Sequence, residues 1–488
     1  MEPVLTVEEM RAVDSAAQRE VPAAVLVERA GTAVAREVLA LLAGSAYGHR
    51  VAVVAGPGNN GSDGRVAARV LERRGARVQL FDARRPPERI EGADVVVDAA
   101  FGTGFRGEYW APAVEPGVPV VAVDVPTGVD ATTGEVRGRA VSAVRTVTFG
   151  ALKPGLLLGP GRQHCGKVRV EAIGLPISAV TAGIWHVEDG DIAALVPPRR
   201  PEDYKWSSAL IAVAGSPGMY GAATFVARAA LRAGAGMVRL GIPGADPGQL
   251  PVSEAVARVL EEVGFESDVL GELGRFEALV VGPGIGRRDG ALESIRRLVA
   301  GSGALPTLVD ADGLAALGSA EEAASLIASR RSPGGWVAYD PSPASPVVLT
   351  PHAGEFARLA GEPPGSDRVA SARDLARRSG AVVLVKGSTT VVAEPGGRVA
   401  ISTAGSSVLA TAGTGDVLSG VVGALLARAV PPLEAAALGA HLHGRAASLG
   451  YEEGLVAGDL PDLVARVLSL SARRRFPPQR FARGAFSG

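Results

Sequence analysis

Short runs of apolar, often β-branched residues alternate with helix-like segments through the first third of the chain. Such near-continuous apolar runs are typical of parallel strands that are buried on both faces. Five of them predict buried strands, at residues 51–56, 77–81, 94–99, 119–125 and 146–150. Residues 64–75, between the first two strands, predict a crossover helix that ends at glycine. The alternation predicts an α/β fold with a Rossmann-like, doubly wound sheet.

The same rhythm stops and then restarts in the rest of the chain. Residues 195–206 are rich in proline and charge, which is typical of a domain boundary. Residues 382–402 predict two strands around a Pro-Gly-Gly turn, and residues 415–429 predict a long helix of small residues. The further strands expected in this part lie at residues 209–215, 237–242, 278–282, 306–311 and 347–350. We therefore expect two α/β domains, residues 1–196 and 203–471, and a basic tail at 472–488.

Charge and composition give no indication of a nucleic-acid-binding, membrane or secreted protein. The net charge of -1 gives no reason to expect nucleic acid or an anionic membrane as a partner. No run of about 18 apolar residues is present, and the acidic start of the chain does not resemble a signal peptide. The single cysteine, Cys165, cannot form an internal disulfide. We expect a cytoplasmic protein that forms a homo-oligomer and binds small molecules.

Lysine is scarce in this chain. The 50 basic residues include only Lys153, Lys167, Lys205 and Lys386, so the other 46 are arginines. The two side chains differ in shape and hydration. The few lysines that remain are therefore a weak indication of positions where arginine does not fit.

The first candidate site is the segment GPGNNGSDG after the first strand. Gly56, Gly58 and Gly61 match the dinucleotide-binding pattern G-x-G-x-x-G, and Asp82 follows at the expected distance. However, Asp63 at the helix start would repel a pyrophosphate, which prefers bare N–H groups. Amide and carboxylate oxygens there suit a cation or a polar ligand, and a capped tight turn is the plain structural alternative.

Further acids follow other strands of the same predicted sheet. Asp98 and Asp124 each end an apolar run, and Asp130 follows shortly after. The carboxyl ends of parallel strands form the ligand crevice of open α/β sheets. A single such aspartate is often a helix cap. Two of them, beside an asparagine-rich loop, predict one polar ligand site.

Four segments of this half together resemble a known family. GPGNNGSDG, DAAFGTGFRG, VDVPTGVDATTG and TVTFGALKPGL occur in the order found in the NAD(P)HX epimerase domain, the YjeF N-terminal type, over residues 5–180. The family usually has Gly-Gly-Asp where this chain has Gly61-Ser62-Asp63. Because serine is small, we expect binding to be kept.

The resemblance implies specific roles. It implies a potassium ion held by Asn60, Asp98 and Thr127. Asp124 would give general acid/base help to epimerisation at C6 of the hydrated nicotinamide ring. The implied substrate contacts are Asp124 itself with Asn59, Asn60, Gly61, Ser62, Asp63, Gly102, Thr103, Gly104, Phe105, Arg106, Gly107 and Glu108.

The second candidate site is the segment AGTGDVLSGVVGALLA. Gly413 and Gly415 precede Asp416 at a predicted helix start, where backbone N–H groups can hold a phosphate. Asp416 beside that phosphate could accept a proton from a substrate hydroxyl, as in phosphoryl transfer. A glycine loop with an aspartate cap is the structural alternative.

The segments around it resemble a second family. VAGSPGMYGAA, VVGPGIG, VDADG, LTPHAGE, VKGSTT and the GTGD motif are similar, in order over residues 207–450, to the ADP-dependent NAD(P)HX dehydratase domain of the ribokinase-like superfamily. The resemblance implies a ribokinase-like α/β sandwich, with Mg²⁺ and ADP as co-substrate. The implied substrate contacts are Ala222, Gly286, His352 and Asp416; the implied nucleotide contacts are Lys386, Gly387, Ser388, Thr389, Thr390 and Gly415.

Two of these residues also stand out on physical grounds. Lys386 ends a buried apolar run, which is an unfavourable place for an unused charge, and nucleotide phosphates would explain it. His352 stands in a loop fixed by Pro351 and Gly354. Lys205 receives no role, because Tyr204-Lys205-Trp206 departs from the His-Lys-Gly that the family often has.

Together the two resemblances imply a bifunctional NAD(P)HX repair enzyme. The first half would interconvert the R and S epimers, and the second would dehydrate the S epimer to NAD(P)H, giving AMP and phosphate from ADP. The main alternative is a ribokinase-like small-molecule kinase with a non-catalytic N-terminal binding domain. An NAD-dependent dehydrogenase is a further alternative, which Asn59, Asn60 and Asp63 disfavour.

Overall fold

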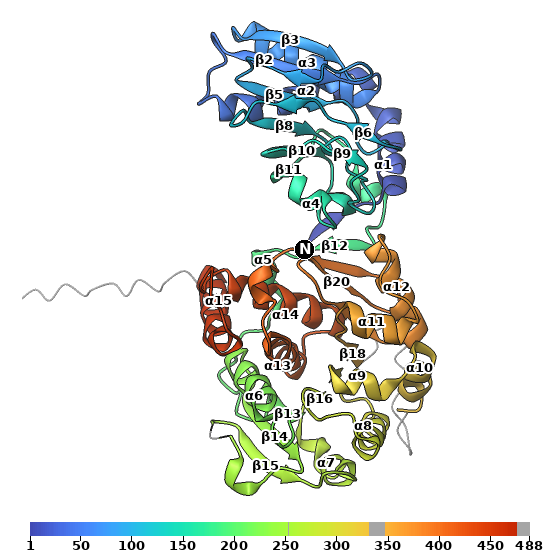
Figure 1. Ribbon diagram of the computed structural model, residues 1–488, viewed down its shortest axis with the longest axis vertical. Helices are drawn as coiled ribbons and strands as arrows, with labels where there is room; N and C mark the ends of the chain where they lie inside the picture. Colours follow the sequence, from blue (N-terminus) through green and yellow to red (C-terminus); the bar gives the residue numbers. More distant parts are fainter. Residues whose placement is uncertain (252, 331–346, 476–488) are drawn as a thin grey trace, which may run out of the picture. The chain divides into compact units, whose positions relative to one another are not determined.

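The computed structural model describes residues 1–251, 253–330 and 347–475, and these form two compact units (Figure 1). The N-terminal unit is essentially Glu2–Trp185, and the C-terminal unit takes up the chain from His186 onward. The proline-rich segment expected at the boundary follows helix α5 (Asp189–Leu195), which belongs to the C-terminal unit. The functional limits 1–196 and 203–471 stay a prediction.

The N-terminal unit is built on a six-stranded parallel sheet with the strand order β11-β10-β8-β5-β2-β3. All five predicted strands are confirmed, whereas β11 was not predicted. Burial of the strand predicted at 77–81 is wrong: β3 lies at the sheet edge, and its side chains are largely exposed. The strands are β2 (Arg50–Ala55), β3 (Arg77–Asp82), β5 (Val95–Ala99), β8 (Val120–Val123), β10 (Arg145–Phe149) and β11 (Lys167–Glu171).

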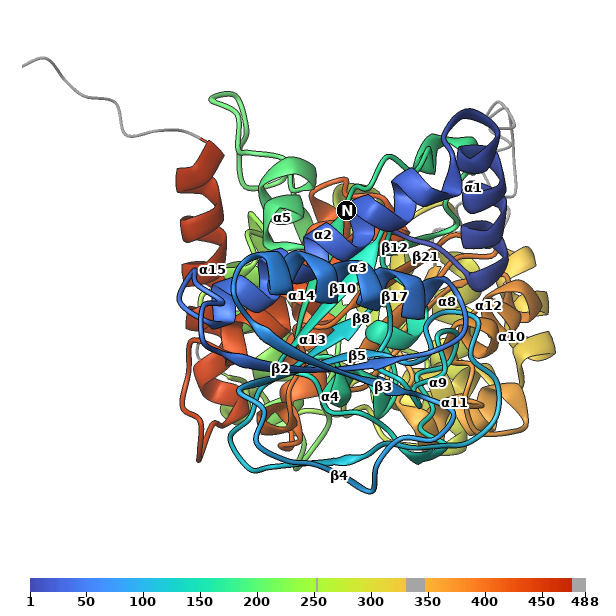
Figure 2. The same cartoon turned by 90° about the horizontal axis from the view of Figure 1, so that it is seen from above.

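Two helices cover one face of this sheet, as Figure 2 shows from above. α2 (Ala23–Leu41) and α3 (Asn59–Arg73) pack on alternate side chains of β2 and β5, such as Val53 and Val97. On the opposite face, Phe101, Phe105 and Tyr109 pack against Val54 and other side chains of the sheet. The remaining elements are α1 (Val7–Glu20), α4 (Gly161–His164), η1 (Pro154–Leu156), η2 (Ile177–Ala179) and the short strands β1 (Glu2–Val4), β4 (Arg89–Ile90), β6 (Tyr109–Trp110), β7 (Ala113–Val114), β9 (Gly138–Arg139) and β12 (Ile184–His186).

The C-terminal unit contains a larger sheet with the order β21-β20-β19-β18-β17-β16-β13-β14-β15. Its strands are parallel except that β20 pairs antiparallel with both neighbours. The hairpin predicted around Pro395-Gly396-Gly397 is confirmed as β20 and β21. β15 was not predicted. The strands are β13 (Ala209–Val213), β14 (Met237–Pro243), β15 (Val256–Leu260), β16 (Ala278–Val281), β17 (Thr307–Val309), β18 (Val347–Leu349), β19 (Val382–Val385), β20 (Thr390–Ala393) and β21 (Val399–Ser402).

Helices lie on both sides of this sheet (Figure 1). The predicted small-residue helix is α13, which packs closely on its neighbours: a Cβ on Gly420 would lie 2.3 Å from the carbonyl oxygen of Val226. α5, α6 (Tyr220–Arg232), α13 (Thr414–Ala427), α14 (Pro432–Ala447) and α15 (Leu460–Arg475) share one apolar core. The other side carries α7 (Glu266–Leu270), α8 (Asp289–Gly301), α9 (Asp312–Leu317), α10 (Ala320–Ala328), α11 (Ala353–Ala360) and α12 (Arg368–Ser379).

Two expectations about the ends and surface of the chain can be compared with the structure. Of the predicted basic tail, residues 472–475 continue α15, and 476–488 lie outside the described residues. Among the helices that the structure describes, none is long and apolar enough to cross a membrane.

The contact between α2 and α3 leads to a stability prediction. A Cβ on Gly31 would lie 2.4 Å from Cβ of Val66 and 2.5 Å from the carbonyl oxygen of Asp63. We expect Gly31→Ala to lower the free energy of unfolding by roughly 1–3 kcal/mol, because the two helices must separate. Calorimetric thermal unfolding would measure this.

The matched control for that substitution is Gly190→Ala. Gly190 lies in α5, and no heavy atom is within 4 Å of the position its Cβ would take. This variant should unfold at the wild-type temperature or slightly above. A Gly31→Ala protein as stable as the control would contradict the close packing.

Candidate active sites

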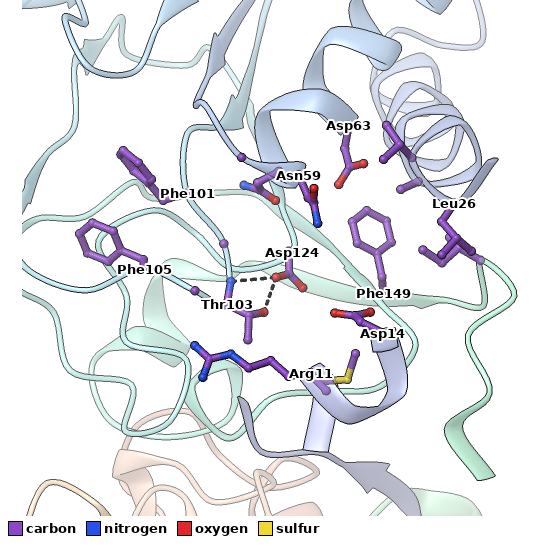
Figure 3. A pocket seen from close by; sticks show the side chains of 18 of the residues that line it. Arg11, Asp14, Leu26, Asn59, Asp63, Phe101, Thr103, Phe105, Asp124 and Phe149 are labelled. Atoms are coloured by element: carbon purple, nitrogen blue, oxygen red, sulfur yellow. Dashed lines mark hydrogen bonds between the residues drawn. The ribbon is translucent and has the colours of Figure 1, made fainter. Parts of the chain in front are cut away.

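The carboxyl ends of β2, β5 and β8 border a cavity of about 470 Å³ in the N-terminal unit (Figure 3). α1 and α2 close its other side. Asn59, Asn60 and Asp63 reach it from the start of α3, as predicted, and Asp124 reaches it from the end of β8. The structure thus brings Asp124 and the asparagine-rich loop together at one cavity. Asp98, the other strand-end acid that was expected there, does not line it and instead borders a separate cavity with Tyr109.

The carboxylate of Asp124 is held by hydrogen bonds from two directions. Its Oδ2 accepts hydrogen bonds from the backbone N–H of Thr103, at 2.9 Å, and from the Thr103 hydroxyl. Its Oδ1 accepts from Nζ of Lys153 at 2.8 Å and from the hydroxyl of Thr148 at 3.2 Å. The backbone of Asp124 has φ 65°, a conformation that non-glycine residues rarely adopt and that is found at functional sites.

Lys153 is the partner that the sequence analysis did not assign. Its side chain is 1% exposed, and Nζ donates to Asp124, to the hydroxyl of Thr148 at 2.8 Å and to the carbonyl of Phe149 at 3.0 Å. All three ammonium donors are therefore used. A buried ammonium of this kind is stable only when fully paired.

The carboxyl groups around the cavity differ in proton affinity. Burial raises the pKa of Asp124, but the charge of Lys153 and the hydrogen bonds from Lys153 and Thr103 outweigh it and hold this pKa below its ordinary value. Burial, with the neighbouring charges of Asp124 and Asp14, raises the pKa of Asp63 to about 8. Burial also raises the pKa of Asp14 on α1. One cavity therefore holds an ionised and a protonated carboxyl group at neutral pH.

Two of the three residues predicted to hold potassium are in direct contact. Asp98 is buried, and its Oδ1 and Oδ2 accept hydrogen bonds from the hydroxyl and the backbone N–H of Thr127, both at 2.8 Å. Burial raises the pKa of Asp98 to about 6. Asn60 points toward Gly102, where a Cβ would lie 3.0 Å from its Oδ1, and its buried Nδ2 has no partner among the described residues.

The other predicted contacts of the first site divide into two groups. Gly102, Thr103, Gly104 and Phe105 line the cavity. Gly61 does not line it but is sterically required, since a Cβ there would lie 1.9 Å from the carbonyl oxygen of Gly56. The predicted residues that do not line the cavity are Gly61, Ser62, Arg106, Gly107 and Glu108. The carboxylate of Asp130, also absent from the lining, caps the turn that follows it.

In the C-terminal unit, Asp310 after β17 organises a second group of polar residues. Its carboxylate is buried and accepts hydrogen bonds from Nζ of Lys386 at 2.7 Å and from the hydroxyl of Ser419 at 2.6 Å. Ala311, the next residue, has φ 52° and precedes α9. The contact joins the ends of β17 and β19 to the first turns of α13.

Asp416 lies in the first turn of α13, as predicted. Among the described residues its carboxylate forms no hydrogen bond or ion pair. Burial and the nearby charge of Asp310 raise the pKa of Asp416 to about 6, although Lys386 opposes the shift. The Lys386 ammonium lies 3.5 Å from the position of a Cβ on Gly415, so it is also next to the helix N-terminus that was expected to bind phosphate.

Two glycine-rich loops meet at the predicted substrate side of this site. A Cβ on Gly284 would lie 2.8 Å from that of Ala222 in α6. The N–H of Gly286 donates to the Asp312 carboxylate at 2.9 Å, and no heavy atom lies within 4 Å of the Cβ position of Gly286. The structure therefore brings the loop of Gly284 and Gly286 against Ala222 in α6 and leaves open space at Gly286.

His352 has a structural contact that the sequence analysis did not foresee. It is the N-cap of α11, and its Nδ1 accepts hydrogen bonds from the backbone N–H groups of Gly354 at 3.0 Å and Glu355 at 3.4 Å. The ring is 58% exposed. A ligand role for Nε2 stays a prediction.

The predicted nucleotide segment forms a compact turn after β19. The hydroxyl of Thr390 donates to the carbonyl of Gly387 at 3.3 Å, and Thr389 and Thr390 are buried. A Cβ on Gly405 would lie 2.8 Å from the carbonyl oxygen of Ser388. The segment is therefore held by its own hydrogen bond and by close contact with the backbone at Gly405.

Comparison with known proteins covers both units. A family model described as NAD(P)H-hydrate dehydratase matches residues 210–469, and one described as YjeF-related protein N-terminus matches residues 23–91 and 83–155. A ribokinase-like superfamily protein from Enterococcus faecalis is similar in structure, with a TM-score of 0.49 and 19% identity over 60% of this chain and 97% of its own.

Relatives match the chain along nearly its whole length. A bifunctional NAD(P)H-hydrate repair enzyme of Mycobacterium leprae is 37% identical, covering 94% of this chain and 96% of the relative. One of Moorella thermoacetica is 34% identical, covering 95% and 96%. The two family models span residues 59–124 with Lys153 and residues 222–419, which contain the residues of the two candidate sites. The chain belongs to the family of bifunctional NAD(P)H-hydrate repair enzymes.

Proposed function

We propose that this enzyme repairs hydrated NADH and NADPH in two steps. The N-terminal unit interconverts the R and S hydrates, and the C-terminal unit dehydrates the S form with ADP, releasing AMP and phosphate. The observation that carries the proposal is that relatives named for this repair match both units, and each unit has a polar site at its strand ends. A kinase with a non-catalytic first half is disfavoured by the same matches.

In the epimerase unit, the hydrated ring would lie in the cavity beside Asp124. The carboxylate is ionised and fixed by Lys153 and Thr103, so it presents a permanent negative charge to the ring. Phe149 and Leu26 supply apolar surface in the same cavity. We assign substrate contact first to the predicted residues that line it: Asn59, Asn60, Asp63, Gly102, Thr103, Gly104 and Phe105.

Asn60, Asp98 and Thr127 would hold a potassium ion in this unit. Oxygen ligands with a single carboxylate carry little charge and suit a hard monovalent cation. The oxygens that support this assignment are the buried carboxyl of Asp98, the buried hydroxyl of Thr127 and the amide Oδ1 of Asn60. The ion would balance the charge of Asp98 and order the loop after β2.

In the dehydratase unit, Asp416 would accept the proton of the ring hydroxyl. The freed oxygen attacks the terminal phosphorus of ADP, and AMP leaves. The C6–O bond then breaks with its electron pair leaving on phosphate, and loss of a proton from C5 restores the ring double bond. Lys386 and the N–H groups at the start of α13 would hold the nucleotide phosphates. Magnesium, when bound, would neutralise charge on them. A cytoplasmic location and a homo-oligomer remain part of the proposal.

The assignment of Asp416 is testable by substitution. Asp416→Asn should slow regeneration of NADH from its S hydrate by roughly 10²–10⁴-fold while ADP binding persists, because only the base is lost. Wild-type turnover should fall as the pH is lowered through about 6, where Asp416 takes up a proton. Absorbance of NADH follows the reaction, with ADP and Mg²⁺ present.

Asp462→Asn is the matched control, because Asp462 forms only surface ion pairs with Arg228 and Arg232. It should turn over like the wild type. Near-normal turnover by Asp416→Asn would refute the base assignment. Accumulation of a stable phosphorylated product by the wild type would favour the kinase alternative.

The epimerase and its ion are testable without nucleotide. The whole protein in KCl should convert the R hydrate to a mixture of both epimers, and replacing K⁺ by tetramethylammonium should slow this exchange. Asp124→Ala should stop the exchange and spare dehydration of the S form. Chromatography of the epimers measures both. Exchange no faster than in buffer would show that the N-terminal unit is a binding module.

A further inference from the structure

Three carboxyl groups from different elements face the cavity of the N-terminal unit: Asp14 of α1, Asp63 of α3 and Asp124 after β8 (Figure 3). Their surroundings differ sharply. Asp124 accepts hydrogen bonds from Thr103, Thr148 and Lys153. Among the described residues, the carboxyl of Asp63 forms no hydrogen bond and no ion pair, although Asp63 is only 6% exposed.

The position of Asp63 is fixed by its backbone rather than by its carboxyl. It lies in the first turns of α3, where the close approach of Gly31 on α2 contacts its carbonyl oxygen. The side chain therefore points into the cavity without a protein partner (Figure 3). A ligand in the cavity is the remaining partner for a group so placed.

Burial, and after it the neighbouring charges of Asp124 and Asp14, keep the proton on the Asp63 carboxyl. The facing groups are the carboxyls of Asp14 and Asp124, the ammonium of Lys153 and the guanidinium of Arg11. Lys153 is bound directly to Asp124. The resulting pKa of Asp63, about 8, means that this carboxyl is mainly neutral at pH 7. A neutral carboxyl beside an ionised one is the arrangement that separates acid and base roles in an active site.

We propose that Asp63 is the catalytic proton donor and acceptor of the epimerisation, and that Asp124 stays ionised throughout as an electrostatic partner. The inference rests on the proposed epimerase function and deepens it. Asp124 cannot share its proton-accepting oxygens readily, because Lys153 and Thr103 already occupy both. Asp63 is the group free to move a proton.

The reaction balances with these two residues and one water molecule. Asp63 gives its proton to the C6 hydroxyl, the C6–O bond breaks with its electron pair leaving on water, and the N1 lone pair forms a C6=N1 iminium. Asp124 faces this positive charge. Water then adds to the other face of C6, the π pair returns to N1, and the proton released by the water returns to the Asp63 carboxylate.

Asp63→Asn in the whole protein tests the inference. Exchange from the R hydrate, measured without ADP, should fall by roughly 10²–10⁴-fold, while KM for the hydrate stays within a few-fold of the wild type. Dehydration of the S hydrate with ADP should be unchanged. Wild-type exchange should decline as the pH rises through about 8, because the acid form is lost. Asp63→Glu should recover part of the rate and keep a decline at alkaline pH.

Two controls separate chemistry from folding. Asp82→Asn makes the same acid-to-amide change at an exposed strand end in the same unit, and should exchange like the wild type. The folded protein holds the Asp63 proton up to about pH 8, whereas the unfolded chain loses it near the ordinary value. This carboxyl therefore opposes folding increasingly as the pH rises toward 8, and Asp63→Asn should unfold at pH 9 no earlier than the wild type.

Several results would overturn the inference. Exchange by Asp63→Asn within threefold of the wild type would exclude the proton-transfer role. A raised KM with unchanged kcat would make Asp63 a binding residue. If the wild type exchanges but shows no decline up to pH 10, Asp63 is not the acid. If the wild type itself does not exchange, the proposed epimerase function fails and the inference fails with it.

Discussion

A lysine–aspartate ion pair with one fully buried partner stands at the carboxyl edge of the sheet in each unit. Lys153 pairs with Asp124 in the first, and Lys386 pairs with Asp310 in the second. Removing two charges from water costs several kcal/mol per ion, and the pair is stable only if its geometry and additional hydrogen bonds compensate. Each pair also fixes charges beside a second carboxyl, Asp63 or Asp416, whose pKa is raised first by burial and then altered by these neighbouring charges.

The lysine–aspartate pair has a different effect on the neighbouring carboxyl group in each unit. In the N-terminal unit Lys153 is paired with Asp124, which stays ionised, and Asp63 nearby keeps its proton up to about pH 8. In the C-terminal unit Lys386 lies between Asp310 and the start of α13, so its charge also reaches Asp416, whose pKa stays near 6. The first site thus presents an acid at neutral pH, and the second presents a base.

Most of the fold could be predicted from the sequence, because strands buried on both faces form continuous apolar runs. The two strands that were not predicted, β11 and β15, have the sequences KVRVE and VARVL. Both lie at a sheet edge, where one face is exposed and accepts arginine, so neither forms a continuous apolar run. The prediction for β3 was wrong in the opposite direction. Its apolar residues suggested burial, but it pairs with a strand on one side only and is largely exposed. Whether a strand lies at the centre or the edge of a sheet depends on the topology, and the local hydrophobic pattern does not contain that information.

The candidate sites were predicted as motifs but not as contacts. Lys153 and Asp124 are 29 residues apart, and Lys386 and Asp310 are 76 apart, so only the folded sheets bring them together. The scarcity of lysine was the available indication for Lys153. The motif VDADG contained Asp310 and Asp312, and α13 contained Ser419, yet their partners could not be read from spacing. His352 was predicted to contact the substrate, but its role as the N-cap of α11 was not predicted.

The central claim is that each site requires a compact ammonium paired with an aspartate at the strand ends. The most direct measurement is the rate of both half-reactions in Lys153→Arg and Lys386→Arg, since arginine keeps the charge but not the shape. The account predicts that Lys153→Arg loses epimer exchange alone and Lys386→Arg loses ADP-dependent dehydration alone. Full activity of either variant in its own half-reaction would contradict it.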